Sequence, residues 1–171
     1  MRYIVEFHDK KEGNMVISFI GHSTIFDADG VKLILKGQIL SNLADDERIS
    51  CYLGGYGDFD EICASVCREL KAMYNGLELV YVTPYFDLSS QQRIKEMIGS
   101  GLYDGSIYPP IENAPKKYAI LKRNEWMISN SDLVIAYVKR NCGGAYRSLE
   151  IARRKGKKII NIFHMIKKEQ E

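Results

Sequence analysis

Two glycine-rich turns are the parts of this sequence best suited to bind a ligand through backbone groups. One is Gly-Gly-Tyr-Gly at residues 54–57, after the apolar run 49–53, and the other is Gly143-Gly144, after the apolar run 133–138. Each turn leads into a segment with helical spacing of apolar residues. Glycine permits positive φ and close approach of a ligand, and the free N–H groups of a helix start favour an anion. We therefore expect a phosphate site, although residues 54–57 form neither a GxGxxG motif nor a P-loop.

Charged residues near these turns supply candidate side chains. Arg123 falls in a predicted helix, where it either holds a phosphate through two hydrogen bonds or lies on a solvated face. Arg147 is a second candidate for the phosphate, but it precedes Glu150 by three residues and the two could pair with each other. Asp60 and Glu61 lie in the first turn of a predicted helix. They either complement the helix dipole, or accept ribose hydroxyls and act as an acid or base.

The histidines and cysteines point to little further chemistry. His22 follows the first apolar run and is either an acid–base or ligand-binding group, or a turn residue with satisfied hydrogen bonds. Cys63 and Cys67, four apart on a predicted helix, fit buried apolar side chains better than a metal pair, because no second Cys or His pair completes a zinc site. No Ser-His-Asp order, Cys-His dyad or nucleophile elbow is evident. We expect neither a metal nor a cofactor.

Composition describes an ordinary globular chain. The 171 residues carry a formal net charge of +2, with 46% hydrophobic and 27% charged residues, which predicts one domain over residues 1–171. No apolar run is long enough to span a membrane and the first residues lack a signal-peptide pattern, so we expect a cytoplasmic protein. The small net charge and the absence of aromatic residues in the basic run 153–158 argue against a nucleic-acid partner.

Apolar runs alternate with segments of helical spacing. Five predicted strands, each covered on both faces, lie at residues 15–20, 49–53, 79–82, 133–138 and 159–163. Predicted helices lie at residues 28–43, 58–74, 89–98, 118–128 and 144–155. This alternation predicts an α/β fold with a mainly parallel sheet, whose ligands bind beyond the carboxyl ends of the strands. Residues 101–115 contain three prolines and predict a loop with a short extended piece around Ile107, and residues 3–7 could add an edge strand.

Several motifs occur in a familiar order. They are Phe-Ile-Gly-His at residues 19–22, the turn 54–60, the segment 79–84, Arg-Asn-x-x-Met-x-x-x-Ser-Asp within residues 122–132, and Gly-Gly-Ala-Tyr at 143–146. Together they resemble the SLOG superfamily, specifically its YpsA-like branch, over about residues 16–162. The resemblance implies a Rossmann-like, doubly wound α/β fold with helices on both faces of a mainly parallel, five-stranded sheet.

The resemblance also implies a function. It suggests a sensor or binding module for a nucleotide or nucleotide sugar, either ADP-ribose-like or a nucleoside monophosphate. The superfamily also includes DNA-processing proteins and the LOG enzymes, which hydrolyse the N-glycosidic bond of nucleoside monophosphates. Arg123 matches the arginine of the LOG arginine–lysine pair and Asn124 replaces its lysine, while residues 145–147 depart from the LOG phosphate element. LOG-like phosphoribohydrolase and nucleoside deoxyribosyltransferase are the alternative activities, the latter with Glu150 or Glu61 as nucleophile.

These arguments define the expected site. The candidate catalytic residues are Glu61, Glu150 and Arg123. The candidate ligand-binding residues are Gly21, His22, Gly54, Gly55, Gly57, Asp58, Asp60, Asn124, Gly143, Gly144 and Arg147. The expected partner is a nucleotide-type small molecule, with no membrane partner, and the relatives that the resemblance implies suggest a homodimer.

Overall fold

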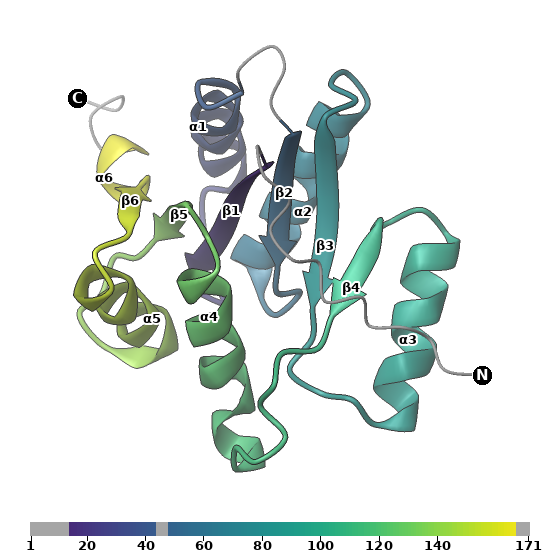
Figure 1. Ribbon diagram of the computed structural model, residues 1–171. Helices are drawn as coiled ribbons and strands as arrows, with labels where there is room; N and C mark the ends of the chain where they lie inside the picture. Colours follow the sequence, from purple (N-terminus) through teal and green to yellow (C-terminus); the bar gives the residue numbers. More distant parts are fainter. Residues whose placement is uncertain (1–13, 44–47, 167–171) are drawn as a thin grey trace.

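The computed structural model describes residues 14–43 and 48–166, which contain a six-stranded sheet in the order β4-β3-β2-β1-β5-β6 (Figure 1). All neighbouring strands in it are parallel. The strands are β1 (Asn14–Gly21), β2 (Arg48–Leu53), β3 (Leu77–Val82), β4 (Gly105–Ile107), β5 (Leu133–Tyr137) and β6 (Lys158–Asn161). The helices are α1 (Ala28–Leu40), α2 (Asp58–Lys71), α3 (Leu88–Gly99), the 3₁₀ helix η1 (Lys116–Tyr118), α4 (Ala119–Ser129), α5 (Gly143–Arg154) and α6 (Phe163–Ile166).

Strand β4 makes the sheet six-stranded, so the expectation of five strands is wrong. It has three residues and pairs with β3, where Val82 lies opposite Ile107. Three residues are too few to produce a periodic pattern, and their neighbours in residues 101–115 have the composition of a loop. The edge strand predicted at residues 3–7 lies outside the described residues.

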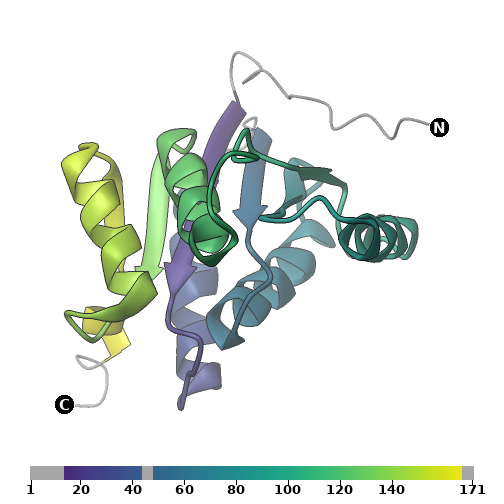
Figure 2. The ribbon, with the colours of Figure 1, turned by 90° about the horizontal axis from the view of Figure 1, so that it is seen from below.

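Helices cover both faces of the sheet, as the alternation of elements predicts. Successive strand residues point to opposite faces. In β1, Ile17 and Phe19 join the core layer beneath α1 and α2, whereas Val16 and Ile20 face the side of α4 and α5. Figure 2 shows the two layers, with α1 and α2 on one side of the strands and α4 and α5 on the other. The α/β class and the parallel sheet with helices on both faces are confirmed.

Three of the cysteines are packing residues. Cys51, Cys63 and Cys67 are buried in the layer beneath α2, and burial raises the pKa of Cys63. Within residues 14–43 and 48–166, no group of three or more His, Cys, Asp or Glu residues is arranged to hold a metal ion. No helix in the same part of the chain has the length and apolar character needed to cross a membrane.

The strand order creates a crevice between β1 and β5. From β1 the chain builds outward through β2 and β3 to β4, and then returns to the other side of β1 for β5 and β6. Helix α1 follows β1 and helix α5 follows β5, so the two connections leave the carboxyl edge toward opposite faces (Figure 1). In open parallel sheets, ligands bind at the carboxyl ends of the strands beside such a reversal.

Candidate functional site

A cavity of about 320 Å³ opens at this crevice. Loops after β1, β2 and β5 form its wall together with residues of α2, α4 and α5. Its polar and glycine lining comprises Gly21, His22, Ser23, Tyr56, Asp60, Arg123, Asn124, Arg140, Cys142, Gly143 and Gly144. The structure therefore brings together seven of the residues proposed for the site: Gly21, His22, Asp60, Arg123, Asn124, Gly143 and Gly144.

Arg123 is the buried cation of this cavity. It projects from α4 toward the sheet and is only 1% exposed. Its Nη1 donates a hydrogen bond to the backbone oxygen of Val82 at 2.9 Å, and the Tyr56 ring centroid lies 5.5 Å from its Cζ. Its Nε has no hydrogen-bond partner in the structure. An unpaired N–H on a buried guanidinium is costly. Arg123 lines the cavity, so an anion bound there would lie beside its positive charge. The alternative of a solvated helix face is therefore wrong for Arg123.

Asp60 stands beside Arg123. Its Oδ2 accepts a hydrogen bond from the backbone N–H of Tyr56 at 2.8 Å. Burial raises the pKa of Asp60, and the charge of Arg123 acts in the opposite direction. A Cβ at Gly54 would lie 2.3 Å from Arg123 Nη1 and 2.8 Å from Asp60 Oδ2. Gly54 is therefore the residue that leaves room for these two side chains to approach the end of β2.

The start of α5 forms the opposite wall. Gly143 has a φ of +86°, and a Cβ at Gly143 or Gly144 would meet nothing within 4 Å. The side chain of Cys142, at the N-cap position, makes no capping hydrogen bond. The first N–H groups of a helix lack intrahelical partners and carry its positive dipole end. These donors and Arg123 therefore line the same cavity, which suits an anionic ligand.

Asn124 and His22 position parts of this wall. Asn124 Nδ2 donates to Ser148 Oγ at 3.2 Å, which joins α4 to α5. His22 Nε2 accepts hydrogen bonds from the backbone N–H groups of Lys139 at 2.9 Å and Arg140 at 3.3 Å. Burial lowers the pKa of His22, and Arg140 and Lys139 lower it further. The structure thus favours the alternative in which His22 is a hydrogen-bonded turn residue with a neutral ring.

Gly21 at the end of β1 and two glycines of the first turn make room for protein atoms instead of a ligand. A Cβ at Gly21 would lie 2.2 Å from the Phe59 ring, and one at Gly55 would lie 2.6 Å from the Tyr81 ring. Gly57 has a φ of +99°, and its Cβ would lie 2.7 Å from the Cα of Ser23. Packing alone accounts for these residues, whereas the glycines that start α5 face open space.

Other predicted residues lie outside this cavity. Gly55, Asp58 and Glu61 line a second cavity of about 580 Å³, whose wall also includes residues of α3. Asp58 Oδ2 accepts a hydrogen bond from the backbone N–H of Ile25 at 2.9 Å.

On α5, Glu150 pairs with Arg153 and not with Arg147, which is exposed. Neither Arg147 nor Glu150 lines the cavity that Arg123 occupies. The two glutamates proposed as catalytic groups, Glu61 and Glu150, are thus separated from Arg123.

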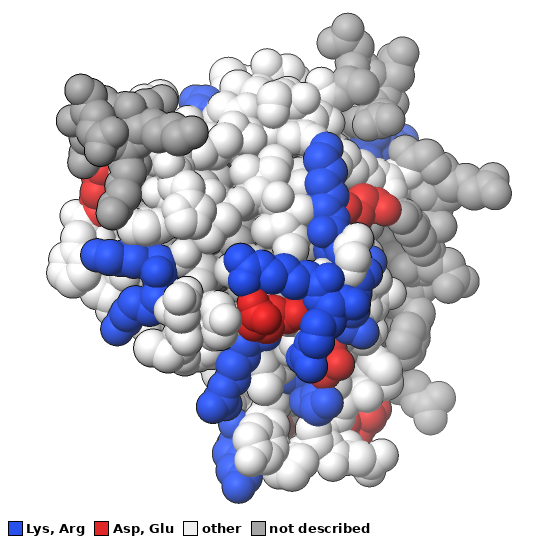
Figure 3. All heavy atoms as spheres, turned by 90° about the vertical axis from the view of Figure 1, so that its left-hand side faces the viewer, with Lys and Arg blue, Asp and Glu red and all other residues white. Residues whose placement is uncertain are grey.

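Sequence reasoning missed four polar residues of the cavity wall: Ser23, Tyr56, Arg140 and Cys142. Burial, together with Tyr81, raises the pKa of Tyr56 to about 12, so its hydroxyl stays protonated at neutral pH. Arg140 is exposed at the mouth of the cavity, next to exposed Lys139. Their only sequence signal is their place after the ends of β1, β2 and β5. Lys and Arg side chains also gather on the face of the molecule that carries α5 and β6 (Figure 3).

No protein-family model matches the chain, and no curated protein is significantly similar to it in sequence. Solved structures do resemble it. DNA processing protein A from Streptococcus pneumoniae superposes with a TM-score of 0.57 at 17% identity, over 85% of this chain and 49% of that one. DNA processing protein A from Helicobacter pylori, reported for its single-stranded DNA binding mode, gives 0.56 at 18% identity, over 85% of this chain and 63% of that one. The chain therefore spans less than two thirds of either neighbour.

This similarity concerns the fold. It agrees with the Rossmann-like architecture that the motifs imply. It contradicts the expectation of a nucleotide or nucleotide-sugar ligand, and with it the two alternative activities on nucleosides, because the neighbours are DNA-processing proteins. The expectation that nucleic acid is not a partner is contradicted by the same finding.

Proposed function

We propose that this protein binds single-stranded DNA at the carboxyl edge of its sheet, with one backbone phosphate in the cavity between β1 and β5. The observation that carries this proposal is Arg123, a buried guanidinium whose Nε lacks a partner and which shares the cavity with the uncapped start of α5. Both groups donate hydrogen bonds, and a phosphate oxygen accepts them. Phosphate contacts of this kind supply most of the affinity of non-specific DNA binding.

The surroundings of the cavity support a strand in preference to a small anion. Exposed Arg140 stands at its mouth, and basic side chains continue over the α5 face (Figure 3). The fold resembles that of a protein reported to bind single-stranded DNA. The net charge of +2 does not reveal this local excess of basic side chains, because acidic residues elsewhere offset it.

Fluorescence anisotropy with a labelled twelve-residue oligothymidylate, dT12, tests the proposal. Arg140 is exposed, so Arg140→Gln should leave the fold intact and weaken binding several-fold. The matched control is Arg48→Gln, which removes an exposed arginine at the amino end of β2, on the opposite edge of the sheet. Absence of dT12 binding by the folded protein, or equal effects of the two variants, would refute the proposal.

We also place the chain in the YpsA-like branch of the SLOG superfamily, with residues 1–171 as one domain. The order of the two glycine turns and of the Arg-Asn-x-x-Met-x-x-x-Ser-Asp stretch supports this placement. In the sheet, the elements carrying these motifs converge on the cavity through Tyr56, Arg123 and Gly143.

A further inference from the structure

A row of aromatic and basic side chains continues from the cavity along the carboxyl edge. The Tyr56 ring, beside Arg123, lies 6.4 Å from the Tyr85 ring in an edge-on arrangement. The ammonium group of Lys116 lies 5.9 Å from the centre of the Tyr85 ring. We call this row the aromatic strip, and its members are Tyr56, Tyr85, Phe86, Tyr108, Lys116, Lys117 and Tyr118.

The strip presents its rings to solvent. Tyr56 is 37% exposed, Phe86 is 47% exposed and Tyr118 is 43% exposed. Phe86 stacks on Tyr108 with ring centroids 5.2 Å apart, and Lys117 lies 4.9 Å from the centre of the Tyr118 ring. Proteins that bind single-stranded nucleic acids combine exposed aromatic rings with basic groups, because the rings stack on bases and the cations contact phosphates.

Hydrogen bonds and prolines restrain the loops that carry the strip. Thr83 Oγ1 donates to the backbone oxygen of Tyr85 at 2.8 Å and accepts from its N–H at 3.2 Å. Gln91 Nε2 donates to the backbone oxygen of Phe86 at 2.9 Å. All four prolines of the chain lie in these loops, at positions 84, 109, 110 and 115, and proline fixes φ. Rings that are already positioned lose little entropy when a ligand binds.

We propose that the aromatic strip stacks the bases of the strand whose phosphate occupies the cavity. This inference rests on the proposed function and adds the path of the DNA to it. The strand leaves Arg123 over Tyr56, passes Tyr85 at the end of β3, and reaches Phe86 and Tyr118. Because every base has an aromatic face, the strip gives affinity without sequence preference. Base stacking on the strip makes the affinity for DNA depend on strand length and on the presence of bases.

The experiment measures anisotropy with labelled dT4, dT12 and a twelve-residue strand without bases. Wild-type protein should bind dT12 much more tightly than dT4, and should lose most of this gain on the strand without bases. Phe86→Ala and Tyr118→Ala should each weaken dT12 binding about 5- to 150-fold, which is the range for removal of one stacking ring. Their dT4 binding should stay close to that of wild type, because the cavity is intact.

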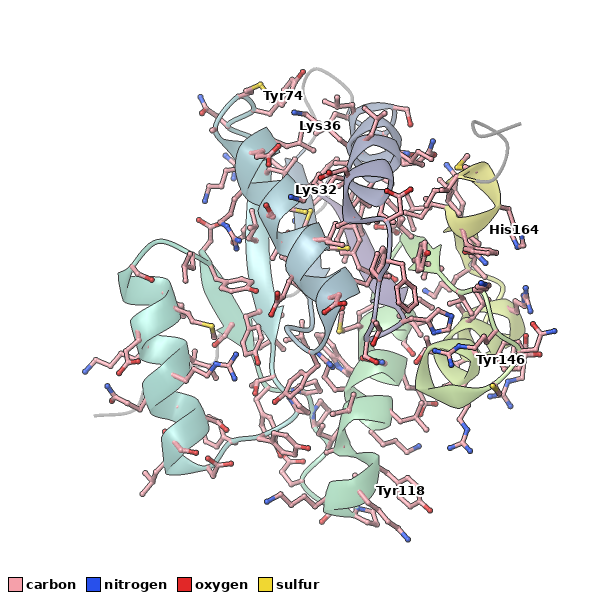
Figure 4. The ribbon with its side chains drawn as sticks, turned by 180° about the vertical axis from the view of Figure 1, so that it is seen from behind. Lys32, Lys36, Tyr74, Tyr118, Tyr146 and His164 are labelled. Carbon is pink, nitrogen blue, oxygen red and sulfur yellow. The ribbon has the colours of Figure 1, made fainter. Side chains whose placement is uncertain are left out.

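Tyr74→Ala is the matched control. Tyr74 is also 43% exposed, and it lies at the opposite end of the molecule from Tyr118 (Figure 4). This variant should bind every strand as wild type does. If Phe86→Ala and Tyr118→Ala bind dT12 like Tyr74→Ala, or if removal of the bases changes nothing, the strip is not a base-stacking surface. That result would leave the proposed function standing. The proposed function fails if wild-type protein binds no strand, or if Arg140→Gln and Arg48→Gln weaken dT12 binding equally.

Discussion

The alanine substitution of Gly144 separates a structural role of this glycine from a role in binding. The φ of Gly144 is not positive, and an added Cβ would meet nothing within 4 Å. Gly→Ala at such a position stabilises by about 0.4–1 kcal/mol, mainly because the unfolded chain loses freedom. For a chain of this size, 1 kcal/mol corresponds to about 2–4 °C in Tm. Gly144→Ala should therefore raise Tm by about 1–4 °C.

The same methyl group should weaken DNA binding. Gly144 lies in the wall of the cavity, at the start of α5, where a phosphate would approach the free N–H groups. Loss of one hydrogen bond to a charged group costs about 1.5–3 kcal/mol, which corresponds to about 10- to 150-fold in affinity. Gly144→Ala should therefore be more stable than wild type and bind DNA less tightly. General damage to the fold does not produce this combination.

Circular dichroism gives Tm, and anisotropy with dT12 gives the affinity. Gly37→Ala is the matched control, because Gly37 lies inside α1, has no positive φ and also faces open space. It should raise Tm and leave binding unchanged. Gly57→Ala should instead lower Tm, because its φ is +99° and its Cβ would meet the Cα of Ser23. If Gly144→Ala raises Tm and binds dT12 as tightly as wild type, the strand does not approach the start of α5.

Three further predictions concern the polar residues of the cavity. Arg123→Lys keeps the charge but loses the planar fork, so it should weaken dT12 binding at least tenfold in anisotropy, and equal affinity would contradict the role of the guanidinium. Asp60→Asn removes a negative charge from the cavity, so it should bind dT12 more tightly at pH 7. Because burial raises the pKa of Asp60, acidification should protonate Asp60 in wild type and narrow the difference in affinity between wild type and the variant. Weaker dT12 binding by Asp60→Asn at pH 7 would contradict the argument. The pKa of His22 is lowered from 6.5 in the folded protein, so the unfolded chain binds the proton more readily and stability is lost as the pH falls below about 6.5. Between pH 7.5 and pH 5, the free energy of urea unfolding should fall less in His22→Gln than in wild type. Equal falls in the two proteins would contradict this prediction.

The fold was largely predictable from the apolar pattern. Runs of four to six apolar residues mark β1, β2, β3 and β5, whose residues are mostly buried. The predicted strand 159–163 overlaps β6, but β6 is an edge strand without a buried residue, so the expectation that it is covered on both faces is wrong. β4 was not predicted, because its three residues form a strand only by pairing with β3, which is a tertiary contact. Helix α3 was predicted at residues 89–98, although none of its residues is buried, and Asp87 caps it in the structure.

The site was less predictable, because residue type does not reveal which neighbours a side chain meets. The glycines of the first turn looked like a phosphate cradle, yet Arg123, Tyr81 and Ser23 occupy the space beside them. Asp60 lines both cavities, whereas Glu61, the next residue, lines only the second, because a step of one residue turns about 100° around a helix.

The proposed nucleic-acid partner was not predicted from the sequence, for a related reason. The basic run 153–158 has no aromatic residues of its own, and the rings that flank cations come from the loops after β2, β3 and β4. Only the folded sheet brings these loops to one edge.

The salt dependence of dT12 binding tests the central claim most directly. Each phosphate of a single strand that a protein neutralises contributes about −0.7 to the slope of log K against log salt concentration. Contacts with Arg123, Arg140 and at least one lysine of the aromatic strip predict a slope of about −2 or steeper. Arg140→Gln should make the slope shallower by about 0.7. A slope near zero, or no binding of dT12 at low salt by the folded protein, would contradict a DNA site at the carboxyl edge of this sheet.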